Sequence, residues 1–313
     1  MVILSWFRLT CTLESVRSVL AQRGVRPRIW IVDQGSDAGT VAVLRDLADR
    51  IPAVNVTPLR ANVGVPAGRN IAIGLGDAPL VVGLDNDAVL DGEHVLRDTV
   101  EWFDANPRTG AVAFRIRNAR TGADDPLSWV HPHSRTPDTT FPAARFCGAA
   151  HALRRSAFDE CGGYDGALFF YWEEADLCRR LLEHGYGIVY VPSLTARHDP
   201  AAEARLGWAD GRFYYCVRNR LYLEYCYGAA PYWLATVAVG YVLRGCRNRL
   251  AGAALRGVAA AGVLAVTRRR QRPRTPLTPE TRAYLREHEG VHGNRPGQRL
   301  RAILARLPEA SRS

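Results

Sequence analysis

Two carboxylates, Asp85 and Asp87, directly follow the apolar run 79–84. In an extended chain, residues i and i+2 point to the same side, so both acids face one place at the end of a predicted strand. Two converging oxygens suit a hard divalent cation such as Mg²⁺ or Mn²⁺, with a phosphate completing its ligands. Because the same spacing recurs at 174–176 and 287–289, the pattern alone leaves two interpretations open: a metal site, and an acidic turn that caps the strand.

A second pair of acids, Glu173 and Glu174, follows the aromatic run 169–172 and opens a predicted helix over 173–182. The aromatic rings would shield a carboxylate from water. Burial and a neighbouring like charge both raise the pKa of a carboxylate, which makes it a better general base. Acids in the first turn also stabilise a helix through its dipole, so helix capping stays open as the structural interpretation.

The elements that would position these acids alternate between strand and helix over the first 200 residues. We expect strands at 2–6, 28–32, 54–56, 80–84 and 187–191, and helices at 13–24, 41–51 and 66–73. The strands are continuous β-branched runs, as in sheets with helices on both faces. This predicts an α/β domain with a mainly parallel sheet, in which the segments leaving the carboxyl ends of the strands build the site.

Polar residues leave these predicted strand ends. Asp33 could accept a hydrogen bond from a nucleotide base, or could form an Asx-type turn or helix cap. The loop 62–70 offers backbone N–H groups and Arg69 to a diphosphate. It is not a GxGxxG motif, which disfavours a Rossmann dehydrogenase. The Pro/Thr/Ser-rich stretch 118–142 predicts a mobile loop.

Composition narrows the chemistry. The 313 residues carry a net charge of +10, and all 41 basic residues are arginine. The absence of lysine excludes a Schiff-base mechanism and the phosphate-binding Walker loop. Seven scattered cysteines without a CxxC pair indicate free thiols in a reducing cytosol, and we expect a cytoplasmic protein.

The last third of the chain differs from the rest. Residues 225–279 contain nine arginines and no acid, and two apolar helices are expected at 231–243 and 250–266. Apolar helices flanked by arginine suit the inner face of an anionic membrane. A helical cap packed on the catalytic domain and a nucleic-acid surface are the other interpretations.

The ordered motifs resemble family-two inverting glycosyltransferases, which have the GT-A fold, over roughly residues 1–225, and most of all their bacterial rhamnosyltransferase-like branch. The matching segments are 5–6, 32–37, 62–64, 69–70, 84–87, 146–150, 162–165, 169–179, 185–187 and 191–198. The sequence departs from the family pattern at two places. The family usually has an acidic pair Glu-Asp where this chain has Glu173-Glu174, and it usually has Asn before the arginine where this chain has Phe7 before Arg8.

The resemblance implies roles for particular residues. A divalent Mn²⁺ or Mg²⁺ would be held by Asp85, Asp87 and His198, and Glu174 or Glu173 would be the general base. For the donor nucleotide we predict contacts from Asp33, Asp37, Asn62, Gly64, Arg69, Asn70, Asp85 and Asn86. For the acceptor we predict contacts from Gly148, His151, Trp172 and Asp176.

We therefore predict a GT-A catalytic domain over 1–225, an apolar, Arg-rich helical segment over 226–270 and a loosely ordered basic tail over 271–313. The predicted activity moves a sugar from a dTDP-rhamnose-like or UDP-sugar donor to a hydroxyl of a glycan, polyprenyl-linked or small-molecule acceptor. It proceeds by one in-line displacement with a carboxylate base. The alternatives are a sugar-nucleotide nucleotidyltransferase and a non-catalytic, Arg-rich protein that binds membrane or nucleic acid, although the family pattern disfavours nucleic acid.

Overall fold

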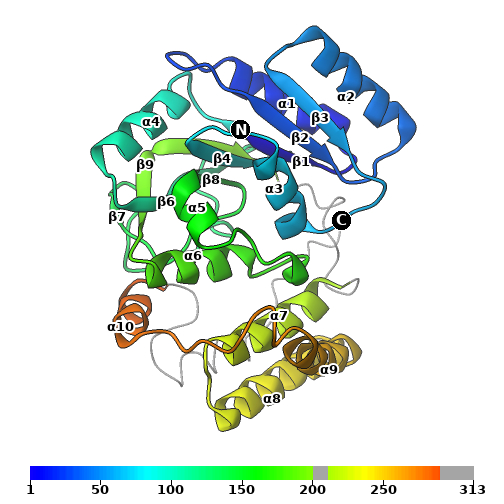
Figure 1. The fold of residues 1–313 in the computed structure, drawn as a ribbon, viewed down its shortest axis with the longest axis vertical. Helices are drawn as coiled ribbons and strands as arrows, with labels where there is room; N and C mark the ends of the chain where they lie inside the picture. Colours follow the sequence, from blue (N-terminus) through cyan, green and yellow to red (C-terminus); the bar gives the residue numbers. More distant parts are fainter. Residues whose placement is uncertain (200–210, 290–313) are drawn as a thin grey trace. The chain divides into compact units, whose positions relative to one another are not determined.

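The computed structural model describes residues 1–199 and 211–289. The described residues form two compact units. The first consists of residues 1–169 and 173–199, and the second of residues 170–172 and 211–289. Figure 1 shows the sheet with its helices in the first unit and a group of helices in the second.

A mixed sheet forms the centre of the first unit. Its strands are β1 (Val2–Ser5), β2 (Ile29–Asp33), β3 (Val54–Pro58), β4 (Leu80–Asp85), β5 (Ala88–Leu90), β6 (Thr109–Asn118), β7 (Phe141–Pro142), β8 (Ala150–Arg154) and β9 (Gly187–His198). They follow the order β3-β2-β1-β4-β8-β6-β9-β5, with β7 paired to β9. The pairs among β1 to β4 and the pair β6–β9 are parallel, whereas β8, β5 and β7 pair in the antiparallel sense. The structure confirms the predicted α/β domain. The sheet is predicted to be mainly parallel, but its named strands form four parallel and four antiparallel pairs, and β8 separates the parallel pairs of β1 to β4 from the pair β6–β9.

Helices cover both faces of this sheet (Figure 1). They are α1 (Leu9–Leu20), α2 (Ala38–Arg50), α3 (Val65–Gly74), α4 (Val95–Ala105), α5 (Arg155–Glu160), the 3₁₀ turn η1 (Gly166–Leu168) and α6 (Glu173–Glu183). Neighbouring strand residues point to opposite faces. Ile3 and Val82 therefore join the core under α1, α2 and α4, and Val2 and Val81 join the core under α3, α5 and α6.

The strand ends meet at one edge of the sheet. In the parallel register, Ser5 of β1 lies beside Asp33 of β2, and Leu4 lies beside Asp85 of β4. Directly after β1 the backbone of Phe7 and Arg8 is left-handed, with φ of 53° and 48°. This conformation costs energy for residues with a Cβ and persists at functional sites. The late strand β9 is longer than the predicted 187–191 and runs on to His198.

The second unit is helical. It contains α7 (Arg212–Cys226), α8 (Pro231–Arg247), α9 (Ala251–Thr267) and α10 (Pro279–His288). This confirms the predicted C-terminal helical, Arg-rich extension, and α7 shares its apolar core with α8 and α9. Helix α10 lies in the segment expected to be loosely ordered, and the rest of that segment, 290–313, is outside the described residues. Among the residues described, no helix is both long enough and apolar enough to cross a bilayer.

Candidate active site

Asp85, Asp87 and His198 form a cluster with the donor set of a metal site. One ligand atom from each residue lies within 4.8 Å of the other two. The sheet creates this arrangement because β5 pairs with the end of β9 and places Ala88 opposite His198. Asp85 ends β4, and the His198 Nε2 atom lies 3.2 Å from Asp87 Oδ1. Two partly exposed carboxylates and the buried imidazole of His198 fit Mn²⁺ or Mg²⁺, whose remaining ligands would come from solvent or a diphosphate.

Arginines balance the two acids of this cluster. The Arg8 Nη1 atom donates to Asp87 Oδ2 at 2.7 Å, and the Arg69 Nη2 atom donates to Asp85 Oδ1 at 2.9 Å. Burial raises the pKa of Asp85, and for that acid it outweighs Arg69. For Asp87, burial acts in the same direction, but His198 and Arg8 outweigh it and lower the pKa. Arg8, whose backbone is left-handed, is therefore also the residue that pairs with Asp87.

Asp125 stands behind His198. Its Oδ2 atom lies 3.9 Å from the Nδ1 atom of His198, on the side of the ring away from Asp87. The carboxylate is 4% exposed and accepts hydrogen bonds from the Ser128 hydroxyl and the Leu127 amide. Burial opposes the charged imidazole, but Asp125 and Asp87 together raise the pKa of His198 to about 9. The sequence gives no signal for Asp125, because this residue lies in the stretch 118–142 that is predicted to be a loop, and no spacing connects it with His198.

Arg69 links this cluster to the predicted base. Its guanidinium is 4% exposed and donates to three groups: Asp85, the carbonyl of Gly148 at 2.8 Å, and Glu174 Oε1 at 3.0 Å. A Cβ atom on Gly148 would overlap the Glu174 carboxylate, so any other residue here would displace that carboxylate from its position. The predicted contact of Arg69 with a diphosphate is thus accompanied by a structural role that the sequence analysis did not foresee.

Glu173, beside Glu174, has a different environment. It is 4% exposed, and its Oε2 atom is buried with no hydrogen-bond partner among the described residues. Burial, followed by the charge of Glu174, raises the pKa of Glu173 to about 8. Glu174 is 20% exposed and ion-paired. The two acids therefore differ in access and in their partners, since Glu174 pairs with Arg69 whereas burial disfavours the charged form of Glu173.

The other predicted donor residues mostly satisfy backbone groups. Asp33 accepts two hydrogen bonds from Ser36, and Asp37 caps α2 through Thr40. Asn62 accepts from the Gly64 amide, Asn70 exchanges two hydrogen bonds with the backbone of Tyr164, and Asn86 donates to Thr12. These hydrogen bonds agree with the interpretation of the residues as turn and helix-cap residues. Their contacts with a donor nucleotide stay predictions.

Of the four predicted acceptor residues, two are buried and a third belongs to the other unit. His151 is 1% exposed, stacks on Phe146 and bonds to the Tyr164 hydroxyl, while Asp176 is fully buried with Arg180 as a partner. Trp172 belongs to the helical unit, where its indole donates to the carbonyl of Cys216. Gly148 alone contacts the arginine that joins Asp85 to Glu174.

The sheet and the site define a GT-A glycosyltransferase. A sequence model of the family "Glycosyl transferase family 2" matches residues 2–162, and the chain belongs to this family. It is therefore a glycosyltransferase, and the nucleotidyltransferase and non-catalytic alternatives are set aside.

Particular relatives agree with this assignment. The chain is 28% identical over 226 residues, 60% of this chain and 72% of the relative, to an N-acetylglucosaminyl-diphospho-decaprenol L-rhamnosyltransferase of Mycobacterium tuberculosis. Its fold is similar to that of a mannosyltransferase from Pyrobaculum calidifontis solved with GDP-Man and Mn²⁺, with a TM-score of 0.58 and 17% identity, covering 96% of this chain and 84% of the other. A second similar fold is S. aureus TarS 1-349 with UDP, with a TM-score of 0.53 and 13% identity over 78% of this chain and 70% of the other.

Proposed function

We propose that this protein is a metal-dependent inverting glycosyltransferase in which Glu174 is the general base. The observation that carries the proposal is the continuous connection from the cluster of Asp85, Asp87 and His198, through Arg69, to Glu174. A single guanidinium thereby fixes the position of a metal-ligand acid relative to a partly exposed carboxylate.

The chemistry follows from this arrangement. Glu174 takes the proton of the acceptor hydroxyl, the acceptor oxygen bonds to the anomeric carbon, and the bond to the nucleoside diphosphate breaks on the opposite face. A divalent cation bound by the cluster would neutralise charge on the departing diphosphate. Glu173 is less suited to be the base, because it is only 4% exposed. A raised pKa strengthens a base, but at about 8 the carboxyl of Glu173 is mostly protonated at neutral pH and cannot accept a proton.

Asp125 has a supporting role in this proposal. A histidine that ligates a metal usually donates its other N–H to a carboxylate, which fixes the ring and its tautomer. Asp125 is the buried carboxylate on that side of His198, and a shift of less than about 1 Å would bring the 3.9 Å separation into hydrogen-bond range.

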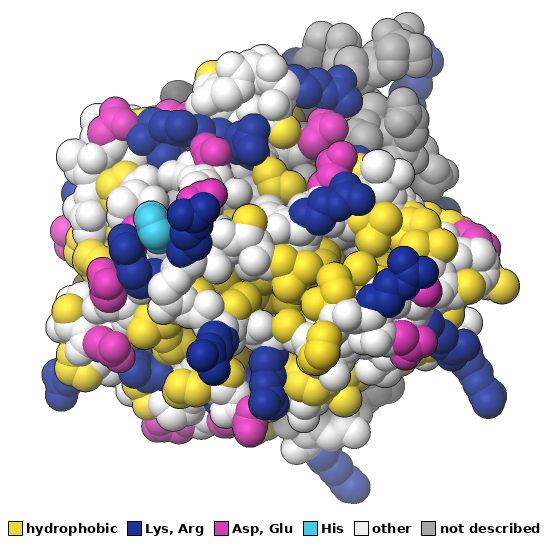
Figure 2. Space-filling model, turned by 90° about the horizontal axis from the view of Figure 1, so that it is seen from above, with side chains coloured by type: hydrophobic (Ala, Val, Ile, Leu, Met, Phe, Trp, Pro, Cys, Tyr) yellow, Lys and Arg dark blue, Asp and Glu magenta, His cyan; other side chains and the backbone are white. Residues whose placement is uncertain are grey.

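For the substrates, we infer a deoxysugar donor such as a dTDP-rhamnose-like nucleotide, with a UDP-sugar as the alternative, and a polyprenyl-diphosphate-linked glycan as acceptor. The relative from M. tuberculosis, whose name contains both an L-rhamnosyl group and a diphospho-decaprenol, supports this choice. The face seen in Figure 2, from above Figure 1, intersperses arginine, acidic and apolar side chains.

We further infer that the catalytic domain extends through α7 to residue 225. Asn219 of α7 donates to the carbonyls of Phe170 and Tyr171, and therefore holds the segment that leads into Glu173. Tyr171 and Trp172 have positive φ, so this segment needs such external support. The apolar helices beyond residue 225 would place the enzyme peripherally on the cytoplasmic face of an anionic membrane.

A thermal-shift experiment tests the proposal. Nucleoside diphosphates with thymine, uracil or guanine bases are added with and without Mn²⁺. A ligand at about 100 times its Kd adds about 2.7 kcal/mol to the free energy of unfolding. We expect the dTDP shift to require Mn²⁺ and to vanish in Asp87→Ala. Equal shifts with and without Mn²⁺ would contradict metal dependence.

A further inference from the structure

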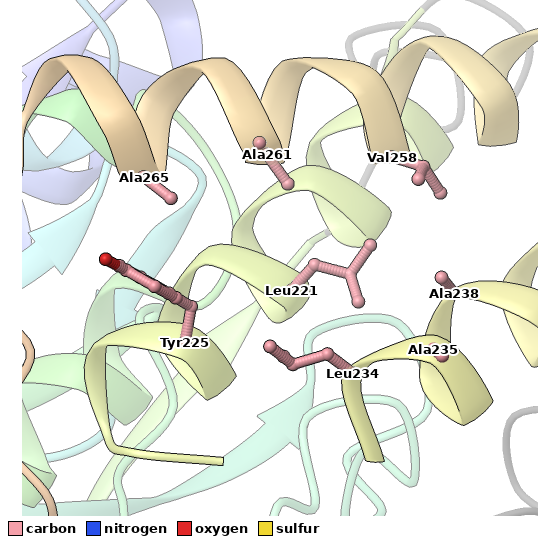
Figure 3. A pocket seen from close by; sticks show the side chains of 9 residues that line it. Leu221, Tyr225, Leu234, Ala235, Ala238, Val258, Ala261 and Ala265 are labelled. Atoms are coloured by element: carbon pink, nitrogen blue, oxygen red, sulfur yellow. The ribbon is translucent and has the colours of Figure 1, made fainter. Parts of the chain in front are cut away.

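An open apolar groove lies within the helical unit, between α7, α8 and α9 (Figure 3). Its volume is about 280 Å³. Its lining consists of Leu221, Tyr225, Leu234, Ala235, Ala238, Val258, Ala261, Gly262 and Ala265. The small residues on α8 and α9 leave the space open, and the Tyr225 hydroxyl is the one polar side-chain atom in this lining. Such a groove suits a hydrocarbon chain rather than a sugar or a nucleotide.

The outer faces of the same two helices are also apolar. On α8, Tyr232, Val239 and Leu243 are more than half exposed, and on α9 the same holds for Leu255, Val263 and Val266. In helical order these positions adjoin the groove residues of their own helix. Exposed apolar surface of this kind, continuous with a groove, marks an interaction site.

Arginines stand at one end of the groove. Figure 3 shows Tyr225 beside Ala265 at this end, and Val258 with Ala238 at the other. The Arg274 guanidinium lies 5.9 Å from the centre of the Tyr225 ring, and three consecutive arginines, 268–270, follow the end of α9. No acid occurs between residues 225 and 279. The end of the groove marked by Tyr225 is therefore suited to an anionic head group.

We propose that this groove binds the isoprenoid chain of a polyprenyl-phosphate-linked acceptor, with the phosphate at the arginines beside Tyr225. The proposal rests on the proposed function, because it gives the lipid part of that acceptor a binding site. The arginines at one end of the groove favour this occupant, since they would pair with its phosphate. A neutral alcohol or an apolar peptide has no anionic group to pair with them.

The test uses the full chain, with farnesyl phosphate as the probe and farnesol and inorganic phosphate as the two half-probes. Titration calorimetry should give the tightest binding for farnesyl phosphate. Gly262→Leu fills the groove, because a Cβ atom at Gly262 meets nothing within 4 Å. It should weaken farnesyl phosphate binding at least about tenfold. The matched control is Gly252→Leu on the same helix, where a Cβ atom meets only Arg256 at 3.6 Å and lies outside the groove.

Several results would overturn the proposal. These are equal affinity for farnesol and farnesyl phosphate, unchanged binding in Gly262→Leu, and an equal loss in both glycine variants. Phosphatidylglycerol vesicles should bind wild type and Gly262→Leu alike, and a parallel loss there would assign the groove to bulk membrane lipid. The Mn²⁺-dependent dTDP shift is measured on the same samples, so that failure of the donor site and failure of the groove are separated.

Discussion

Replacing the buried carboxyl group of Glu173 by an amide should stabilise the protein at alkaline pH. In the unfolded chain this group loses its proton near its ordinary pKa of 4.5, and in the fold only near about 8. Between these values the folded state holds more protons than the unfolded state, so the wild-type free energy of unfolding falls as pH rises. At about 1.4 kcal/mol for each unit of pKa, the total fall in the free energy of unfolding is about 5 kcal/mol.

Glu173→Gln removes this pH dependence, because glutamine does not titrate. In the wild type, the raised pKa of Glu173 lowers the free energy of unfolding by about 1 kcal/mol near pH 5 and by about 5 kcal/mol near pH 9. The stability of Glu173→Gln relative to wild type should therefore rise by about 4 kcal/mol across that range. Urea unfolding at the two pH values, with the slope checked for constancy, measures the difference.

Glu174→Gln is the matched control for this experiment. It makes the same chemical change one residue later, but it removes the ion pair with Arg69 and should destabilise the fold. If the stability of Glu173→Gln relative to wild type did not change with pH, Glu173 would be ionised in the fold. The reason for preferring Glu174 as the base would then be lost.

The remaining predictions concern metal binding, turnover and backbone strain. Asp125→Asn should weaken Mn²⁺ binding by about 10- to 100-fold, measured by electron paramagnetic resonance of free Mn²⁺, and an unchanged affinity would remove Asp125 from the site. Glu174→Gln should keep the Mn²⁺-dependent dTDP shift but lower turnover by about 10²- to 10⁴-fold, and normal turnover would refute its role as base. Gly64→Ala should lower the free energy of unfolding by more than about 1 kcal/mol, since Gly64 has a φ of 89° and a Cβ there would overlap Phe169. Gly122→Ala, with a φ of 69° but open space, should cost less, and an equal loss would show that the overlap is not the cause.

The residues that could be predicted from the sequence are those with a local signal. The period of two in an extended segment predicts that Asp85 and Asp87 share a side, and the structure brings both to His198. The connection between Asp125 and His198 had no such signal, since the two residues are far apart in sequence and meet only because of the tertiary fold. His151 shows the opposite failure, in which a polar residue expected at the site is buried. It lies opposite Gly83 on the neighbouring strand, and the missing side chain of that glycine leaves space for the imidazole ring.

The chemistry of arginine explains how one side chain, Arg69, can join Asp85 to Glu174. Arg69 donates in one plane to Asp85, to Glu174 and to the carbonyl of Gly148. A guanidinium offers five N–H donors in a fixed fork, whereas a lysine ammonium is a single point charge that could not span both carboxylates. Almost complete burial makes the position of Arg69 rigid, and Gly148 provides the space that Glu174 requires. The distance between the acid that would hold the metal and the carboxylate that would accept the proton is thus fixed by a single side chain, which neither acid could achieve through its own backbone position.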